Sequence, residues 1–223
     1  MNTNPVVLDI ETSGLDKVNC GIWQIGAIDL DDTKEVFFES SSIDDDDIVE
    51  DGALRVIGKT EEQLRDDKKQ SQEELIEKFF KWMQKRKIRN LLCQNPQFDI
   101  TFLEIRAKKY GLRKTIQHRA FDLHTISQMK HFNINNGFLL AKNNDSRMES
   151  DMGLTNTLQF CGIPETRVIT GNEGVVKDGS PHNALDDCKL TGECYYRMVY
   201  GKNLFPEFSQ FKIPNYLIGK GKK

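Results

Sequence analysis

Short strand-like segments alternate with helical segments along this sequence, and this alternation constrains the fold more than any other feature. Three strand-like segments open the chain, at about residues 6–8, 22–30 and 35–39. Two further candidate strands, 89–94 and 118–123, are each followed by a helical pattern. Consecutive strands favour a meander, whereas strands that alternate with helices favour parallel pairing through crossovers. The sequence therefore predicts an α/β fold with a central mixed β-sheet flanked by helices.

The helical segments carry recognisable start and stop signals. Ser71 followed by Glu74 forms a capping-box pattern, which predicts a helix to about Arg86. Gly111 follows a helical pattern at residues 98–110, and glycine commonly ends a helix. The other helices are predicted from 123 to about 132, at 154–161 and at about 182–200.

Two polar or glycine-rich stretches interrupt this pattern. Residues 133–152 are rich in Asn, Asp and Ser, and we expect a long irregular loop there. Residues 170–181 carry three glycines and predict a second loop. We expect one domain over residues 1–200 and a C-terminal tail at 201–223, whose four aromatic side chains pack back onto the domain.

Composition excludes several classes of protein. The formal net charge of −3 argues against a protein that coats nucleic acid through a basic surplus. The sequence has no uninterrupted apolar run of about 18 residues and no signal-peptide pattern at its first residues, so a cytoplasmic protein without a membrane partner is expected. Its five cysteines form no CxxC pair, which disfavours a disulfide framework or a zinc site.

Two acids stand at the end of the first predicted strand. Asp9 and Glu11 are two residues apart, and the pleat of a strand points such residues to the same side. Two carboxylates on one side of a strand can share a divalent ion. Taken alone, this pair is more simply read as exposed carboxylates at the end of a strand.

Three more candidates lie far along the chain. Asp99 is in the first turn of a predicted helix, where an acid is favourable without any function. Asp187 is near the start of the last predicted helix, and His182 precedes it by five residues. That spacing does not put both side chains on one helix face. His182 is therefore expected on the preceding loop or cap, above a site that Asp187 lines.

Together the four acids predict a two-cation site. Asp9, Glu11, Asp99 and Asp187 would hold two divalent ions roughly 4 Å apart, an arrangement used for displacement at phosphorus. Oxygen ligands select Mg²⁺ or Mn²⁺ over zinc. With an ordinary pKa of about 6.5, His182 could take a proton from the attacking water near neutral pH.

The order of these motifs resembles the DEDDh-type 3′-5′ exonucleases, which include the proofreading subunits of bacterial replicative polymerases. Residues 7–15, with Asp9 and Glu11, resemble the first motif of that family, 95–99 the second and 182–187 the third. The resemblance spans about residues 5–200 and implies a ribonuclease H-like fold. It also implies metal-dependent release of nucleoside 5′-monophosphates from a free 3′ end, with two cations held by the four acids and His182 as general base.

The resemblance further implies contacts with the terminal nucleotide from Thr12, Leu15 and Phe98. Each has a structural alternative, because Thr12 could simply fix a turn and the other two could be core residues. The motifs leave DNA and RNA open as substrates, and an exoribonuclease acting on short RNA is an alternative. A nucleic-acid-binding protein with a decayed active site is another, although all five chemical residues are present.

Overall fold

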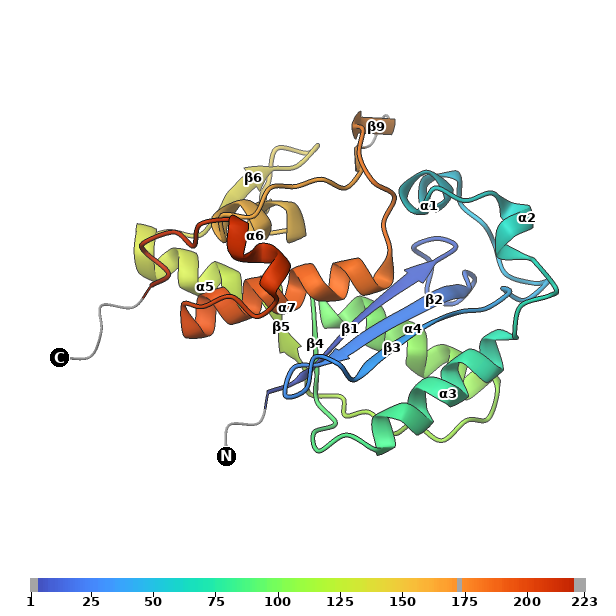
Figure 1. Ribbon diagram of the computed structural model, residues 1–223. Coiled ribbons are helices and arrows are strands. Elements are labelled where there is room, and N and C mark those ends of the chain that lie inside the picture. Colours follow the sequence, from blue (N-terminus) through green and yellow to red (C-terminus); the bar gives the residue numbers. More distant parts are fainter. Residues whose placement is uncertain (1–3, 172–173, 219–223) are drawn as a thin grey trace.

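The computed structural model describes residues 4–171 and 174–218, and a five-stranded mixed sheet lies at its centre (Figure 1). The strand order is β3-β2-β1-β4-β5. β2 runs antiparallel to its neighbours β1 and β3, whereas β4 runs parallel to β1 and β5. The strands are β1 (Val6–Thr12), β2 (Ile22–Asp29), β3 (Val36–Ser40), β4 (Leu91–Cys93) and β5 (Phe121–Asp122).

Helices cover both faces of this sheet (Figure 1). α3 packs against β2 and β3, and α4 against β4 and β1, while α7 packs against β2, β1 and β4 and is itself backed by α5 and α6. The helices are α1 (Asp51–Ile57), α2 (Glu61–Leu64), α3 (Gln72–Gln84), α4 (Pro96–Lys109), α5 (Leu123–Asn135), α6 (Leu154–Phe160) and α7 (Ala184–Tyr200), with a 3-10 helix at Pro206–Gln210.

The alternation of side chains along β1 divides the core into two layers. Val6, Leu8 and Ile10 are buried in the cluster that contains the side chains of α3 and α4. Val7 is buried in the other cluster, with side chains of α7. Because side chains two residues apart on a strand share a face, Asp9 and Glu11 continue the Val7 row toward α7.

Local signals in the sequence account for where several helices begin. The predicted capping box is present, with Ser71 accepting from the Glu74 amide and Glu74 reaching back to Ser71. α4 starts two residues earlier than predicted because Pro96 occupies the first turn, where its missing N–H costs nothing. β5 is shorter than the predicted strand at 118–123, because the side chain of Asp122 accepts from two amides and starts α5 at once.

The stretch predicted as an irregular loop at 133–152 is structured, and that prediction was wrong. It contains the end of α5 and an antiparallel hairpin of β6 (Leu140–Lys142) and β7 (Met148–Ser150). The side-chain amide of Gln128 exchanges two hydrogen bonds with the backbone of Leu139, at 2.8 and 3.0 Å, and so anchors the hairpin to α5. The polar composition of residues 133–152 favoured a loop prediction because the residues of β6 and β7 are exposed to solvent.

The stretch at 170–181 also departs from the predicted loop. It contributes to a second hairpin of β8 (Ile169–Gly171) and β9 (Gly174–Lys177). Residues 172 and 173 lie outside the described part of the chain.

The C-terminal tail packs back onto the domain through its aromatic residues, as expected. Phe205 is buried, and Tyr216 stacks on Phe160 and donates a hydrogen bond to its carbonyl oxygen. The guanidinium of Arg197 in α7 donates to the carbonyl oxygens of Phe208 and Phe211.

All five cysteines are buried free thiols. In the described residues, no helix has the length and apolar character needed to cross a bilayer.

Candidate active site

The start of α7 is fixed directly over the acid-bearing face of β1. In the β1–β2 ladder Asp9 lies opposite Gly26 and Glu11 opposite Gln24, so all four share one face. The Gln24 side-chain oxygen accepts a hydrogen bond from the Ala184 amide at 3.0 Å. At Gly26 an added Cβ would come within 2.4 Å of the Ala184 backbone, so only glycine allows this close approach.

This docking brings a third acid, Asp187, and the histidine to the same place. Asn183 caps α7 by accepting from two backbone amides, and Asp187 follows within the first turns. His182 precedes the cap, as its spacing from Asp187 predicted, and its amide donates to the Val56 carbonyl oxygen. Glu11, His182 and Asp187 each present a ligand atom, and these atoms all lie within 4.8 Å of one another.

Asp99 reaches the site from the turn between β4 and α4. Asn95 adopts a left-handed conformation with φ of 64°, and its amide donates to Asp122 at 3.2 Å. Pro96 then opens α4, and Asp99 lies in its first turn, 4% exposed. Asp9 keeps part of its surface exposed, and the charges of Asp187, Glu11 and Asp99 all act on it. The four acids thus come from three distant segments and act on one another through their charges. At this site, the ligand atoms of the described residues that lie within 4.8 Å of one another belong to Glu11, Asp187 and His182, and the group includes neither Asp9 nor Asp99.

Two carboxylate oxygens at this site are buried and have no hydrogen-bond partner among the residues that the structure describes. They are Oε1 of Glu11 and Oδ1 of Asp187. A buried carboxylate oxygen without a donor or a cation is costly, because burial removes its hydration. The two atoms therefore mark positions where a cationic ligand would relieve an energetic cost.

Burial raises the pKa values of Asp9, Glu11 and Asp99, and repulsion from neighbouring carboxylates adds to the rise at Asp9 and Glu11. The pKa of Glu11 rises to about 8, first through burial and then through the charge of Asp187. Burial raises the pKa of Asp99 to about 7, although nearby backbone amides lower it in part. The pKa of Asp9 is well above its ordinary value for the same reasons as that of Glu11. Such shifts in a cluster are typical of functional sites.

The two ring nitrogens of His182 have different partners. Nε2 lies 3.0 Å from the carbonyl oxygen of Val168, and Nδ1 lies 3.3 Å from Oδ2 of Asp187. Burial lowers the pKa of His182, but the hydrogen bond to Asp187 and its charge outweigh that effect and raise it above 6.5. Because a carbonyl oxygen only accepts, Nε2 carries a proton and Nδ1 faces the acids.

A buried guanidinium that the sequence motifs did not indicate also belongs to this site. Nη1 of Arg167 lies 2.9 Å from Oδ2 of Asp187, and Nη2 lies 2.6 Å from Oε2 of Glu165. Arg167 is 7% exposed. The sequence offers one weak signal for this residue. Glu165 and Arg167 carry opposite charges two residues apart, and the apolar residues Val168 and Ile169 follow them directly.

A cleft of about 270 Å³ opens beside the acids, between the end of β1 and α1. Thr12, Leu15 and Phe98 all line it, together with Glu11. Leu15 is 74% exposed there, which excludes the alternative that it is a core residue. The hydroxyl of Thr12 donates to the Gly14 carbonyl oxygen at 2.7 Å, so Thr12 also fixes the turn.

A second acidic cluster lies away from this site and is already neutralised. Asp44, Asp46 and Asp47 lie close together. Lys109 bridges Asp44 and Asp46, and the buried guanidinium of Arg106 contacts Asp47 at 2.6 Å. The cluster joins α4 to the segment before α1.

Comparison with known proteins assigns the chain to a family. The profile of the exonuclease family RNase_T matches residues 6–146. The chain belongs to this exonuclease family. The match covers the motifs of Asp9, Glu11 and Asp99, whereas His182 and Asp187 lie beyond it.

Individual relatives agree with this assignment. The chain is 29% identical over 123 residues to a PolC-type DNA polymerase III from Caldanaerobacter subterraneus subsp. tengcongensis, which covers 55% of this chain and 8% of the polymerase. Among solved structures, Escherichia coli exonuclease I with a dT13 oligonucleotide superposes with a TM-score of 0.63 and 16% identity, over 88% of this chain and 41% of that one.

The nuclease domain of 3′hExo, a DEDDh family member bound to rAMP, gives a TM-score of 0.60 and 16% identity over 94% of both chains. These likenesses confirm the predicted ribonuclease H-like fold with a mixed sheet flanked by helices, and the family match confirms that the chain resembles exonucleases. The chain spans less than half of the polymerase and of exonuclease I.

Proposed function

We propose that the protein is a divalent-metal-dependent 3′-5′ exonuclease of the DEDDh subtype. It removes nucleoside 5′-monophosphates from nucleic acid with a free 3′ end. The observation that carries this proposal is the approach of Glu11, His182 and Asp187 within 4.8 Å, beside a cleft and within an exonuclease family fold.

The side chains at the site fit two hard cations. All the ligand atoms offered by Asp9, Glu11, Asp99 and Asp187 are carboxylate oxygens, which suit Mg²⁺ and allow Mn²⁺ to substitute. The unpartnered oxygens of Glu11 and Asp187 and the raised pKa values of Glu11 and Asp99 support this fit. When bound, the two cations supply Lewis-acid stabilisation of the negative charge that develops around phosphorus.

His182 accepts a proton from the attacking water in this proposal. The Val168 carbonyl oxygen holds a proton on Nε2, so the accepting atom is Nδ1, which faces Glu11 and Asp187. The contact with Asp187 at 3.3 Å then stabilises the imidazolium that forms. The bond between phosphorus and the 3′ oxygen of the preceding nucleotide breaks, that oxygen takes up a proton from solvent, and the imidazolium returns its proton to solvent.

The cleft receives the terminal nucleotide. Leu15 and Phe98 offer apolar surface to a base or sugar, and Thr12 at the end of β1 lines the same cleft, as Glu11 does. Stacking on aromatic side chains tolerates any base, because every base has a π-face. The apolar side chains that line the cleft would therefore suit an exonuclease that removes any of the bases.

Single-stranded DNA or a frayed duplex end is the favoured substrate, because the matched relative is a DNA polymerase. Short RNA is the second candidate, since 3′hExo was solved with rAMP. A binding protein with a decayed site is disfavoured because all four acids and His182 are present. A cytoplasmic location remains a prediction from the sequence.

Oligonucleotides labelled at either end test the activity and its direction. DNA and RNA of matched sequence, labelled at the 3′ or the 5′ end, are incubated with the protein in Mg²⁺, Mn²⁺ or EDTA. We expect immediate loss of the 3′ label as a mononucleotide, gradual shortening of 5′-labelled strands, and no reaction in EDTA. Internal cuts, release of the 5′ label first, or full activity in EDTA would overturn the proposal.

A further inference from the structure

The guanidinium of Arg167 is held from both sides by carboxylates. Nε and Nη2 contact Oε1 and Oε2 of Glu165 at 3.0 and 2.6 Å, which is a two-point ion pair. Nη1 is left to donate to Oδ2 of Asp187 at 2.9 Å. Glu165 also accepts from the Thr155 hydroxyl at 2.8 Å. Glu165 therefore fixes the plane of the guanidinium, and that plane fixes where Nη1 points.

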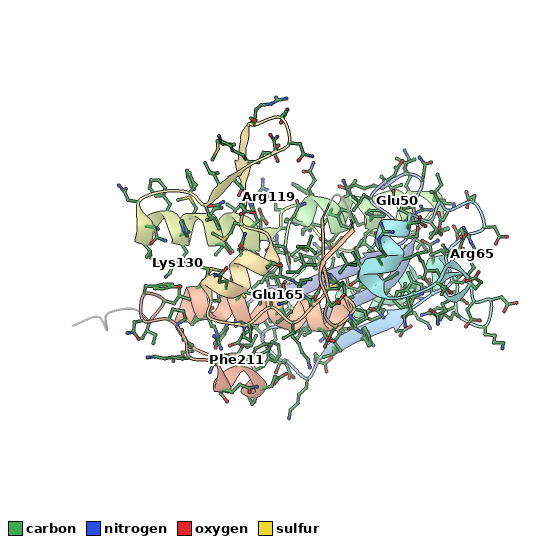
Figure 2. All side chains as sticks on the ribbon, turned by 90° about the horizontal axis from the view of Figure 1, so that it is seen from above. Glu50, Arg65, Arg119, Lys130, Glu165 and Phe211 are labelled. Atoms are coloured by element: carbon green, nitrogen blue, oxygen red, sulfur yellow. The ribbon has the colours of Figure 1, made fainter. Side chains whose placement is uncertain are left out.

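The backbone that carries Arg167 is itself anchored beside the start of α7. Val168 donates its amide to the Ser180 carbonyl oxygen, and Ser180 donates to Thr166, both at 2.9 Å. An added Cβ at Gly179 would lie 2.5 Å from the Arg167 carbonyl, so the two backbones touch. In Figure 1 the linker between α6 and α7 runs along one side of α7, reaches β9 and then descends to the start of that helix, and Figure 2 labels Glu165 on this linker.

The same segment holds the histidine. The carbonyl oxygen of Val168, the residue after Arg167, contacts Nε2 of His182. Adjacent residues of one segment thus contact Asp187 through a side chain and His182 through the backbone. A shift of this segment would move both groups together.

The two oxygens of Asp187 have unequal surroundings as a result. Oδ2 is 2.9 Å from Arg167 and 3.3 Å from His182, whereas Oδ1 is buried without a partner. Arg167 carries a positive charge that would repel a cation, but Glu165 lies closer to it and offsets that charge. Paired with Glu165, Arg167 therefore donates to Oδ2 while its positive charge is offset.

We propose that Arg167 is a positioning residue of the exonuclease site. It fixes Asp187 through Oδ2, so that Oδ1 is presented to a divalent cation, and Glu165 aligns it for this task. This inference rests on the proposed function, because it assumes that Asp187 ligates a cation.

Direct binding of Mn²⁺ to the full chain tests this role without relying on activity. Titration calorimetry compares the natural protein with Arg167→Met, which removes the donor but keeps much of the side-chain volume. Arg147→Met serves as a control, because it removes the same charge from a side chain that is 80% exposed on the β6–β7 hairpin. Thermal melting of each variant fixes a temperature at which all of them are folded.

We expect Arg167→Met to bind Mn²⁺ roughly 10- to 100-fold more weakly, while Arg147→Met binds as the natural protein does. Turnover at saturating Mn²⁺ should fall with little change in the KM for an oligonucleotide. Binding to Arg167→Met that equals or exceeds that of the natural protein would overturn the inference. A lower melting temperature with unchanged binding would also do so, because it would make Arg167 a structural brace only.

A second variant keeps the test decisive if Arg167→Met does not fold. Arg167→Lys retains the charge but cannot contact both oxygens of Glu165 and Oδ2 of Asp187 in one plane. We expect Arg167→Lys to bind Mn²⁺ more weakly than the natural protein does, and unchanged binding would overturn the inference. Absence of Mn²⁺ binding by the natural protein would instead contradict the proposed function itself.

Discussion

Asp187 and His182 lie in contact but have different tasks in the proposed reaction. Asp187 offers a buried oxygen with no partner, which suits a cation ligand. His182 is held outside the helix with Nδ1 toward the acids, which suits a proton acceptor. Substitutions at these two positions should therefore affect cation binding and turnover in different ways.

Replacing each residue by alanine separates the two tasks. Asp187→Ala should abolish turnover and weaken Mn²⁺ binding. His182→Ala should lower turnover by about 10²- to 10⁴-fold, the usual range for a lost general base, with Mn²⁺ binding retained. Turnover of labelled oligonucleotide and Mn²⁺ calorimetry on folded variants measure both effects. A natural rate in either variant would contradict the assignment.

The buried carboxyl group of Glu11 should make stability depend on pH when no cation is present. Its pKa is about 8 in the folded protein, against 4.5 as the ordinary value. The folded state therefore binds the proton of Glu11 more tightly than the unfolded state does. The stability that this proton binding contributes is complete below about pH 4.5 and is lost as the pH rises toward 8.

Denaturant unfolding in EDTA, with natural protein and Glu11→Gln compared at a series of pH values, measures this effect. The stability of the variant relative to the natural protein should increase between about pH 4.5 and 8. The slope should not exceed about 1.4 kcal/mol per pH unit. The exposed Glu73→Gln provides a matched change of charge. A constant difference across the range would refute the burial argument for Glu11.

The candidate site residues were predicted from three short motifs in order along the sequence, because each residue taken alone also has a purely structural explanation. Asp9 and Glu11 share a strand face by the period of a strand, and the distance from His182 to Asp187 required a position outside the helix. Arg167 could not be predicted in this way. Its function depends on contacts with Glu165 and with a helix twenty residues further along the chain, which no local pattern records.

At the level of elements, the seating of α7 on β2 decides whether the site forms. Gly26 permits the backbone of Ala184 to approach, and Gln24 accepts its amide. The two residues thus place the first turns of α7 above Asp9 and Glu11. A small displacement of this helix would carry Asp187 and His182 away from the acids of β1.

Gly26→Ala tests this seating. The added methyl group would overlap the Ala184 backbone, so we expect a loss of stability of about 1–3 kcal/mol. We also expect a drop in turnover on the order of a hundredfold, since small misplacements of reacting groups have large effects. Gly137→Ala is the control, because nothing lies within 4 Å of its added Cβ. Equal turnover in the two variants would show that the close approach is unimportant.

Elements with strong local signals were predicted well, and those held by distant partners were not. The sheet strands and α3, α4 and α7 follow from apolar periodicity and caps. The β6–β7 hairpin was mistaken for a loop because its anchor is Gln128 on another element, and its own residues are exposed. An exposed hairpin buries neither face, so its sequence lacks the alternation of apolar and polar residues that predicts a strand.

At the level of the whole molecule, the two faces of the sheet differ in the side chains that β1 presents. The face toward α3 and α4 is an apolar core, whereas the face toward α7 changes from apolar Val7 to acidic Asp9 and Glu11 along β1. The apolar part of that second face carries α7, and the acidic end lies open beside the cleft. One strand thus contributes to both the core and the proposed site.

A crystal structure of the protein grown with Mn²⁺, with anomalous diffraction recorded at the manganese edge, tests the central claim most directly. We predict two anomalous peaks roughly 4 Å apart, bounded by Asp9, Glu11, Asp99 and Asp187. The oxygens Oε1 of Glu11 and Oδ1 of Asp187 should lie among the ligands. Manganese bound at Asp44, Asp46 and Asp47 instead, or four acids that stay without a cation at saturating Mn²⁺, would contradict it.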